Sequence, residues 1–214
     1  SKIKKPEKSE WWNKSEVVDN LKGLVAISDG GMYPIFLAAK KRFDPPNLQK
    51  LIEIITKLHF RAKTVCNVSY TNIEALVVRI CTNFKNSSGY SLPDVVEDIL
   101  NWGSYPSDDE FELKFKQLSL TSSPKAKYVL SELEYAMTGG RSMGGKSVDD
   151  DVTVEHILPK SIDGDWTTEL DANPNLNTPA EISDYHKRNL YRLGNLTLLA
   201  PRPNSIIQND PYSI

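Results

Sequence analysis

The chain has 214 residues, 39% of them hydrophobic and 25% charged, and its net charge of −2 lacks the strong positive excess common in dedicated nucleic-acid binders. No apolar run approaches the roughly 18 residues of a membrane span, which argues against a membrane protein. The two cysteines, Cys66 and Cys81, form no CxxC pair, which excludes a thiolate zinc knuckle. We therefore expect a folded protein of the reducing cytoplasm without a membrane partner.

The first 138 residues carry apolar side chains at the spacing of helical faces. The clearest case is TNIEALVVRICTNF, in which Ile73, Leu76, Val77 and Ile80 recur on one side. Ser107 precedes Glu110 by three residues, which is the signature of a capping box at a helix start. We predict a helical bundle domain over residues 1–138, with six or seven helices within residues 16–27, 34–43, 47–60, 71–84, 92–102, 107–118 and 125–137.

The pattern changes after Met137. The polar stretch TGGRSMGGKSVDDD indicates a Gly/Asp-rich linker over residues 139–150. A β-type run at Val152–Leu158 follows, and then a Pro- and Asn-rich stretch, DANPNLNTPAEIS, which we interpret as a long loop. A second β-type run at Leu193–Ala200 precedes a short terminal segment. The expected order within residues 151–214 is therefore strand, long loop, strand and short helix.

One motif in the linker imitates a phosphate-binding loop. GRSMGGKS, residues 140–147, matches the pattern GxxxxGK[ST], which binds phosphate when it leaves a strand and opens a helix. Here a predicted helix precedes the motif, and three aspartates and a predicted strand follow it. We expect this chain to bind no nucleotide.

The residues that suggest chemistry lie in the last third of the chain. VEHILPK places Glu155 beside His156 at a strand end, Asn195 follows about forty residues later, and Asn204 comes nine residues after that. Adjacent strand residues point to opposite faces, but a sharp turn at Pro159 can bring both side chains to one site. This is the layout of an HNH-type nuclease. A neutral imidazole can activate water, and Glu and Asn oxygens suit Mg²⁺ or Mn²⁺.

Several motifs resemble the GmrSD-type, modification-dependent restriction endonucleases and their SspE-like relatives. They are VEHILPK, the later Trp166, RLGNLTLL and NSIIQNDPY, together with the helical stretches FRAKTVCNVSYTNIEAL, SDDEFELKFKQL and KAKYVLSELE. The resemblance implies a mainly α protein in which a helical bundle precedes a small ββα-metal, HNH-like nuclease domain over residues 151–214. It also implies DNA as a partner and a divalent metal, Mg²⁺ or Mn²⁺, as the cofactor.

The resemblance assigns roles to single residues. His156 would be the general base, and Asn195 would hold the loop that positions it. Glu155 and Asn204 would bind the metal, while Asn209 is a candidate for metal, phosphate or capping contacts. Basic and imidazole side chains nearby are candidate phosphate contacts: Lys160, His186, Lys187, Arg188, Arg192 and Arg202. From the sequence, His186 is otherwise expected to lie in the long loop.

The expected function is a metal-dependent DNA endonuclease or nickase domain of an anti-phage restriction protein. We expect the family's N-terminal nucleotide-binding and sensing domain to be absent from these residues and to be their partner. The alternative is a non-catalytic helical interaction or scaffold module with a degenerate nuclease fold. The intact set Glu155, His156, Asn195 and Asn204 argues against the alternative, because drift would be expected to strike at least one of them.

Overall fold

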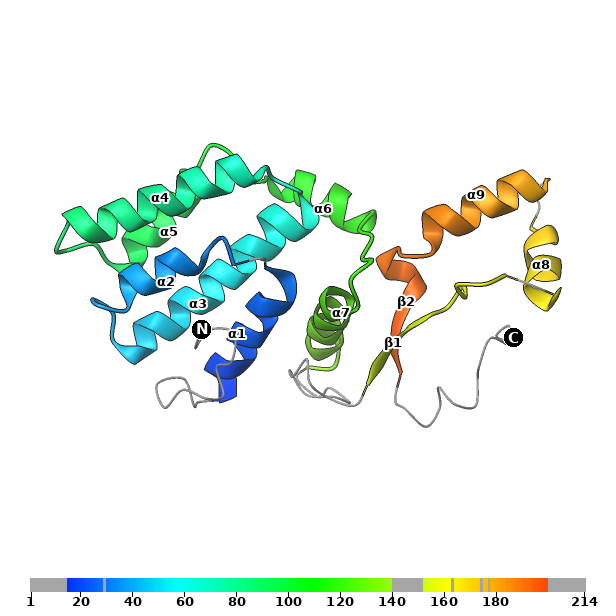
Figure 1. The fold of residues 1–214 in the computed structure, drawn as a ribbon, viewed down its shortest axis with the longest axis horizontal. Helices are drawn as coiled ribbons and strands as arrows, with labels where there is room; N and C mark the ends of the chain where they lie inside the picture. Colours follow the sequence, from blue (N-terminus) through cyan, green and yellow to red (C-terminus); the bar gives the residue numbers. More distant parts are fainter. Residues whose placement is uncertain are drawn as a thin grey trace. The chain divides into compact units, whose positions relative to one another are not determined.

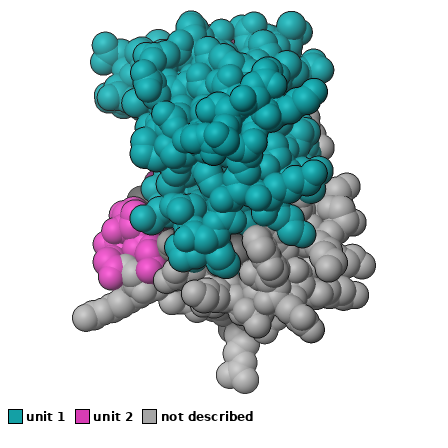
Figure 2. Space-filling view, turned by 90° about the vertical axis from the view of Figure 1, so that its left-hand side faces the viewer, with its two compact units in different colours: residues 1–116 teal, residues 117–214 magenta. Residues whose placement is uncertain are grey.

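The structure is a computed structural model that describes residues 15–28, 30–139, 152–162, 164–173, 175–176 and 178–199. The chain divides into two compact units, residues 1–116 and 117–214 (Figure 2). The first unit is entirely helical in its described part, and the second combines helices with a two-stranded sheet. None of the helices in the described ranges is long and apolar enough to cross a membrane.

The first unit consists of α-helices and one π-helical turn. They are α1 (Ser15–Ile27), α2 (Tyr33–Ala39), α3 (Pro45–His59), the π-helix Phe60–Val65, α4 (Tyr70–Asn86), α5 (Leu92–Leu100) and α6 (Asp108–Lys116). Capping residues that the sequence makes visible begin several of them. Asp44 accepts a hydrogen bond from the Asn47 N–H at the start of α3, and Ser107 accepts one from the Glu110 N–H at α6. The helices predicted from apolar periodicity are thus confirmed in this part of the chain.

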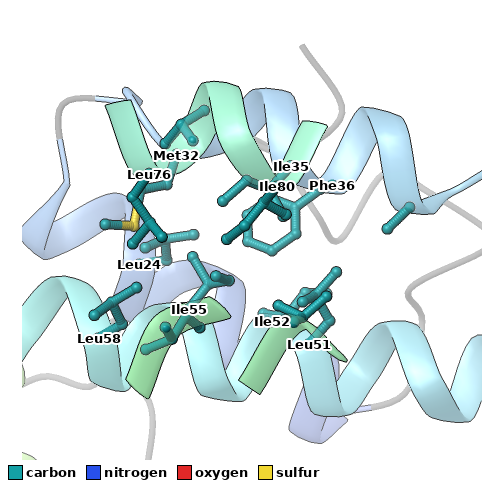
Figure 3. Packing of buried hydrophobic residues seen from close by; sticks show 14 of the residues in the cluster. Leu24, Met32, Ile35, Phe36, Leu51, Ile52, Ile55, Leu58, Leu76 and Ile80 are labelled. Atoms are coloured by element: carbon teal, nitrogen blue, oxygen red, sulfur yellow. The ribbon is translucent and has the colours of Figure 1, made fainter. Parts of the chain in front are cut away.

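The core of this unit forms where the apolar faces of the helices meet. Figure 3 shows side chains of α3, among them Leu51, Ile52 and Ile55, directed toward Phe36 of α2 and Ile80 of α4. All five are at most 2% exposed. Full burial of such a side chain contributes roughly 1.5–3 kcal/mol to the free energy of unfolding. Burial of these side chains is therefore a main source of the stability of the helical unit.

The second unit contains α7 (Ser123–Met137), β1 (Thr153–His156), α8 (Gly164–Asp171), α9 (Pro179–Asn189), a 3₁₀ turn at Leu193–Asn195 and β2 (Leu196–Leu199). The strands β1 and β2 pair antiparallel, from Thr153 opposite Leu199 to His156 opposite Leu196 (Figure 1). The small antiparallel pair predicted from the sequence is confirmed, although both strands are shorter than expected. Leu193–Asn195 turns before β2 begins, because the Asn195 N–H bonds the Arg192 carbonyl.

The boundary between the units differs from the predicted one. We expected the bundle to end at residue 138, but α7 packs against both β1 and β2 and so belongs to the second unit. The connecting segment before α7 also joins this unit. Its Leu118 carbonyl accepts from the Leu193 N–H at 2.8 Å, and its Leu120 N–H donates to the Tyr191 carbonyl at 2.7 Å. These bonds fix the chain that enters β2.

The long loop predicted between the strands is wrong, because two helices, α8 and α9, lie in that segment. Helix α9 begins within the stretch that we interpreted as loop. Thr178 caps it by accepting a hydrogen bond from the Glu181 N–H, and Pro179 occupies the first turn, where its missing N–H is tolerated. A small apolar cluster holds these helices to the chain after β1; it consists of Leu158, Leu170, Leu176 and Ile182, with Ile162, Trp166 and Tyr185 packed against it.

The phosphate-loop-like motif and nearly all of the predicted linker lie outside the described residues. The described chain before the motif is the helix α7, and the chain after it enters the strand β1. The motif is therefore not preceded by a strand, as a phosphate-binding loop would be. The predicted terminal helix also lies outside the described residues.

Candidate active site

His156 is the last residue of β1 and is partly buried. Its imidazole and the Tyr191 ring form a T-shaped pair, with the ring centroids 5.5 Å apart and the planes at 80°. The Nε2 atom is shielded from solvent and has no hydrogen-bond partner among the described residues. A buried polar atom without a partner costs about 1–3 kcal/mol, so its presence calls for an explanation. In its deprotonated form, an imidazole nitrogen without a partner can accept a hydrogen bond or a proton from a group that reaches it.

The surroundings of His156 favour its neutral form. Burial lowers the pKa of its imidazole below the ordinary value of 6.5, and the positive charge of Lys160 lowers it further. The negative charge of Glu155 acts in the opposite direction but is the smallest of the three causes. At neutral pH the ring is therefore mostly uncharged and able to act as a base.

Asn195 fixes the loop that follows His156. Its side-chain Oδ1 accepts from the Leu158 N–H at 2.7 Å, and its Nδ2 donates to the Leu158 carbonyl at 3.1 Å and to the Leu190 carbonyl at 2.9 Å. Its backbone carbonyl accepts from the Ile157 N–H at 2.9 Å. The amide thus ties the chain after β1 to the chain before β2. The role expected of Asn195, to hold the loop that positions His156 in catalysis, stays a prediction to which these hydrogen bonds give a structural basis.

Glu155 lies in the strand beside His156, opposite Thr197 of β2. Regular pairing extends through His156, so the bend begins at Ile157, after both residues. The side chains of Glu155 and His156 therefore leave the strand from opposite faces. This differs from the expected turn that brings both side chains to one side, although the Glu155 charge still acts on His156.

The described candidates for phosphate contact lie after β1 and around α9. Lys160 is exposed in the chain after β1, and Lys187 and Arg188 are exposed on α9. Arg188 lies 3.9 Å from Asp184 in an exposed ion pair, which competes only weakly with other anions. Arg192 forms an isolated β-bridge with Ser119, at the entry to the 3₁₀ turn.

His186 lies on α9 and not in a loop, which corrects the expected position. Its Nε2 is 2.7 Å from the Pro159 carbonyl oxygen. The bond joins α9 to the same chain segment that Asn195 holds.

Three predicted site residues, Arg202, Asn204 and Asn209, lie outside the described residues. Within the described ranges, no group of three or more His, Cys, Asp or Glu side chains is placed to hold a metal ion. Glu155 is therefore the only predicted metal ligand whose position the structure gives.

Sequence reasoning missed two features of this site. Tyr191 meets the His156 ring from 35 positions away in the chain, and no local pattern marks such a contact. Residues 118–120 pair with the chain before β2, but Leu118 was assigned to the end of a helix and Leu120 to no element.

Comparison with known protein families now gives the class of this protein. Residues 105–214 match a family model of restriction endonucleases, which are enzymes that cut DNA. That model describes the C-terminal domain of the GmrSD restriction endonucleases, and it covers just over half of the chain, so the chain belongs to this family. Comparison with curated proteins and with solved structures gave no match. Family membership indicates a nuclease role and implies DNA as the substrate.

Proposed function

We propose that this chain is a metal-dependent DNA endonuclease or nickase of the HNH type, which hydrolyses phosphodiester bonds with His156 as the general base. The observation that carries the proposal is the His156 imidazole, which is held at the end of β1 with an Nε2 that has no partner in the described part of the chain. Membership of a restriction endonuclease family supports it independently. The proposal places the protein in modification-dependent defence against phage, within the cytoplasm.

In the proposed reaction, the neutral His156 accepts a proton from the water that attacks phosphorus. The lowered pKa keeps the imidazole uncharged at neutral pH, and the contact with the Tyr191 ring limits the orientations that it can adopt. Asn195 holds the loop after His156 in one conformation. The imidazole is then already positioned when the substrate binds, and no entropy is lost in ordering it before the reaction.

Glu155 and Asn204 are the residues that would hold a hard divalent cation, because carboxylate and amide oxygens are ligands that Mg²⁺ and Mn²⁺ prefer. Of the two, Glu155 lies in the described residues, on the strand β1. Asn204 would supply a second oxygen, and Asn209 is a further candidate for metal or phosphate. When bound, such a cation supplies stabilisation of negative charge on the phosphate and the leaving oxygen.

The substrate backbone would meet the basic side chains that follow β1 or lie on and after α9. Lys160, Lys187, Arg188 and Arg192 lie in the chain after β1 and on or just after α9, and Arg202 follows β2 in the sequence. Contacts of this kind orient DNA without reading its bases. The scaffold alternative predicts no cleavage at all, so activity separates the two functions directly.

The first expected result is cleavage of supercoiled plasmid that depends on a divalent metal. The wild-type chain should convert the plasmid to nicked or linear DNA with Mg²⁺ or Mn²⁺, and EDTA should abolish the conversion, because the phosphate charge is then left without a counter-ion. Gel electrophoresis measures the products. Cleavage that continues undiminished in EDTA would contradict metal dependence, and no cleavage of any plasmid, modified or unmodified, would favour the scaffold.

The second expected result concerns pH. His156 acts as a base only when deprotonated, and burial lowers its pKa below 6.5, so cleavage should stay constant near neutral pH and fall only once the pH drops below 6.5. Removing the positive charge in Lys160→Ala should raise the pKa slightly and move the acid limb to higher pH. Single-turnover rates across pH measure both effects. A rate that rises as the pH falls through this range would argue against His156 as the base.

A further inference from the structure

The loop after His156 is held by hydrogen bonds from two separate elements. Asn195, next to β2, bonds both backbone groups of Leu158. His186, on α9, places its Nε2 2.7 Å from the Pro159 carbonyl oxygen. A carbonyl oxygen only accepts hydrogen bonds, so Nε2 carries the proton and donates it. Two consecutive carbonyl groups of the loop are thus each bonded by a side chain.

The Pro159 carbonyl has few other possible hydrogen-bond partners than His186. Pro159 is buried and has no backbone N–H, so its carbonyl oxygen is its only backbone hydrogen-bonding group. The sheet cannot supply a partner, because the pairing of β1 with β2 ends at His156. His186 thus provides a hydrogen-bond donor for the Pro159 carbonyl, which lies beyond the paired residues of the sheet.

Apolar packing already attaches α9 to this loop. Leu158 lies in one cluster with Ile182 of α9, and Tyr185 of the same helix packs against that cluster. The hydrogen bond is therefore not needed to bring the helix and the loop together. The hydrogen bond adds a restraint on the orientation of the loop backbone, because a hydrogen bond weakens when its distance or angle changes.

We propose that His186 is a positioning residue of the candidate active site, which fixes the Ile157–Pro159 backbone and thereby the orientation of the His156 imidazole. The inference rests on the proposed nuclease function, in which His156 is the base. It differs from the phosphate contact expected from the sequence, because the Nε2 donor of His186 is engaged by the Pro159 carbonyl. A misplacement of a reacting group by about 1 Å can lower a reaction rate roughly 100-fold. Loss of the His186 bond should therefore lower the rate of the cleavage step and leave DNA binding largely unchanged.

Two substitutions separate the hydrogen bond from the bulk of the side chain. His186→Leu keeps an apolar side chain beside the cluster but removes the donor, whereas His186→Gln keeps an N–H that can reach the carbonyl. Single-turnover cleavage of supercoiled plasmid with Mg²⁺ or Mn²⁺, measured over a range of protein concentrations, gives the limiting rate and the half-saturating concentration. We expect His186→Leu to lower the limiting rate about 10-fold or more with little change in half-saturation, and His186→Gln to recover most of it.

A phosphate contact would give the opposite pattern. The half-saturating concentration would rise, and the limiting rate would stay the same. That pattern in His186→Leu would overturn the inference, and Lys187→Ala provides the comparison for an exposed basic neighbour. Asn189→Ala is the matched control for damage to α9, because it removes only the bond from Asn189 Nδ2 to the Tyr185 carbonyl. Its limiting rate should equal that of the wild type.

A second measurement does not depend on cleavage. Amide hydrogen exchange at Ile157 and Leu158 should be faster in His186→Leu than in the wild type, and unchanged in Asn189→Ala. Unchanged exchange in His186→Leu would overturn the inference even if the chain cuts DNA. If exchange is faster in His186→Leu but the wild-type chain cuts no DNA with either metal, the proposed nuclease function is contradicted. The conclusion that His186 restrains the loop would still stand.

Discussion

Replacing His156 with alanine should lower the rate of DNA cleavage by roughly 10²–10⁴-fold, which is the effect of losing a general base. The physical reason is the partnerless, shielded Nε2 at the end of β1, which alanine cannot replace. Affinity for Mg²⁺ or Mn²⁺ should change little, because the proposed metal ligands Glu155 and Asn204 remain. Plasmid nicking measures the rate, and calorimetric titration measures the metal affinity.

The stability of this variant is the control. Because Nε2 makes no hydrogen bond within the described part of the chain, alanine leaves no partner unsatisfied there, and the main loss is the contact with the Tyr191 ring. Thermal unfolding should therefore remain cooperative, with a small decrease in midpoint. If highly purified His156→Ala protein nicks plasmid as fast as the wild type, then His156 is merely a residue at a strand end and the assignment is wrong.

The parts of this fold that follow from local patterns could be predicted from the sequence. Seven helices in the described chain up to residue 139 follow the apolar periodicity, and the two strands follow the alternation around Glu155 and before Ala200. The assignment of α7 could not be predicted, because a helix with one apolar face packs equally well on other helices or on a sheet. Its contacts with β1 and β2 are decided by the tertiary fold.

Helix α9 was not predicted, although the sequence contains the residues typical of a helix start. Thr178, Pro179 and Glu181 follow the order of a helix start, with a capping hydroxyl, a first-turn proline and an acidic residue near the positive end of the helix dipole. The surrounding prolines and asparagines outweighed this signal. The placement of His186 on α9, and with it the bond to Pro159, was lost as a consequence.

In the candidate site, too, the residues marked by local sequence patterns could be predicted, whereas contacts between distant parts of the chain could not. Glu155, His156 and Asn195 stand out in the sequence because the first two end one strand-like run, Asn195 opens the next, and their spacing is typical of a nuclease. Tyr191 does not, because its contact with His156 depends on how the chain from α9 returns toward β2. The position of Asn204 relative to Glu155 stays a prediction, since Asn204 lies outside the described residues.

Asn195→Ala should reduce both cleavage and stability. The change removes three side-chain hydrogen bonds, two to Leu158 and one to the Leu190 carbonyl, and leaves partly buried backbone groups without those partners. Each such group costs about 1–3 kcal/mol, so the free energy of unfolding of this unit should fall by at least that amount. The loop after His156 loosens as a result, and the cleavage rate should fall roughly 10- to 100-fold. Denaturant unfolding and plasmid nicking measure the two effects.

Asn195→Asp distinguishes the hold on the loop from simple loss of volume. An aspartate keeps the acceptor for the Leu158 N–H but has no donor for the carbonyls of Leu158 and Leu190, and its negative charge would lie against both. This variant should therefore be at least as impaired as Asn195→Ala, although it is nearly the same size as the wild type. Asn189→Ala, which removes an amide from α9 without touching the loop, should retain both stability and activity. Full activity in Asn195→Asp would show that the hydrogen bonds to Leu158 and Leu190 do not position His156, since repulsion at both carbonyls must displace the loop.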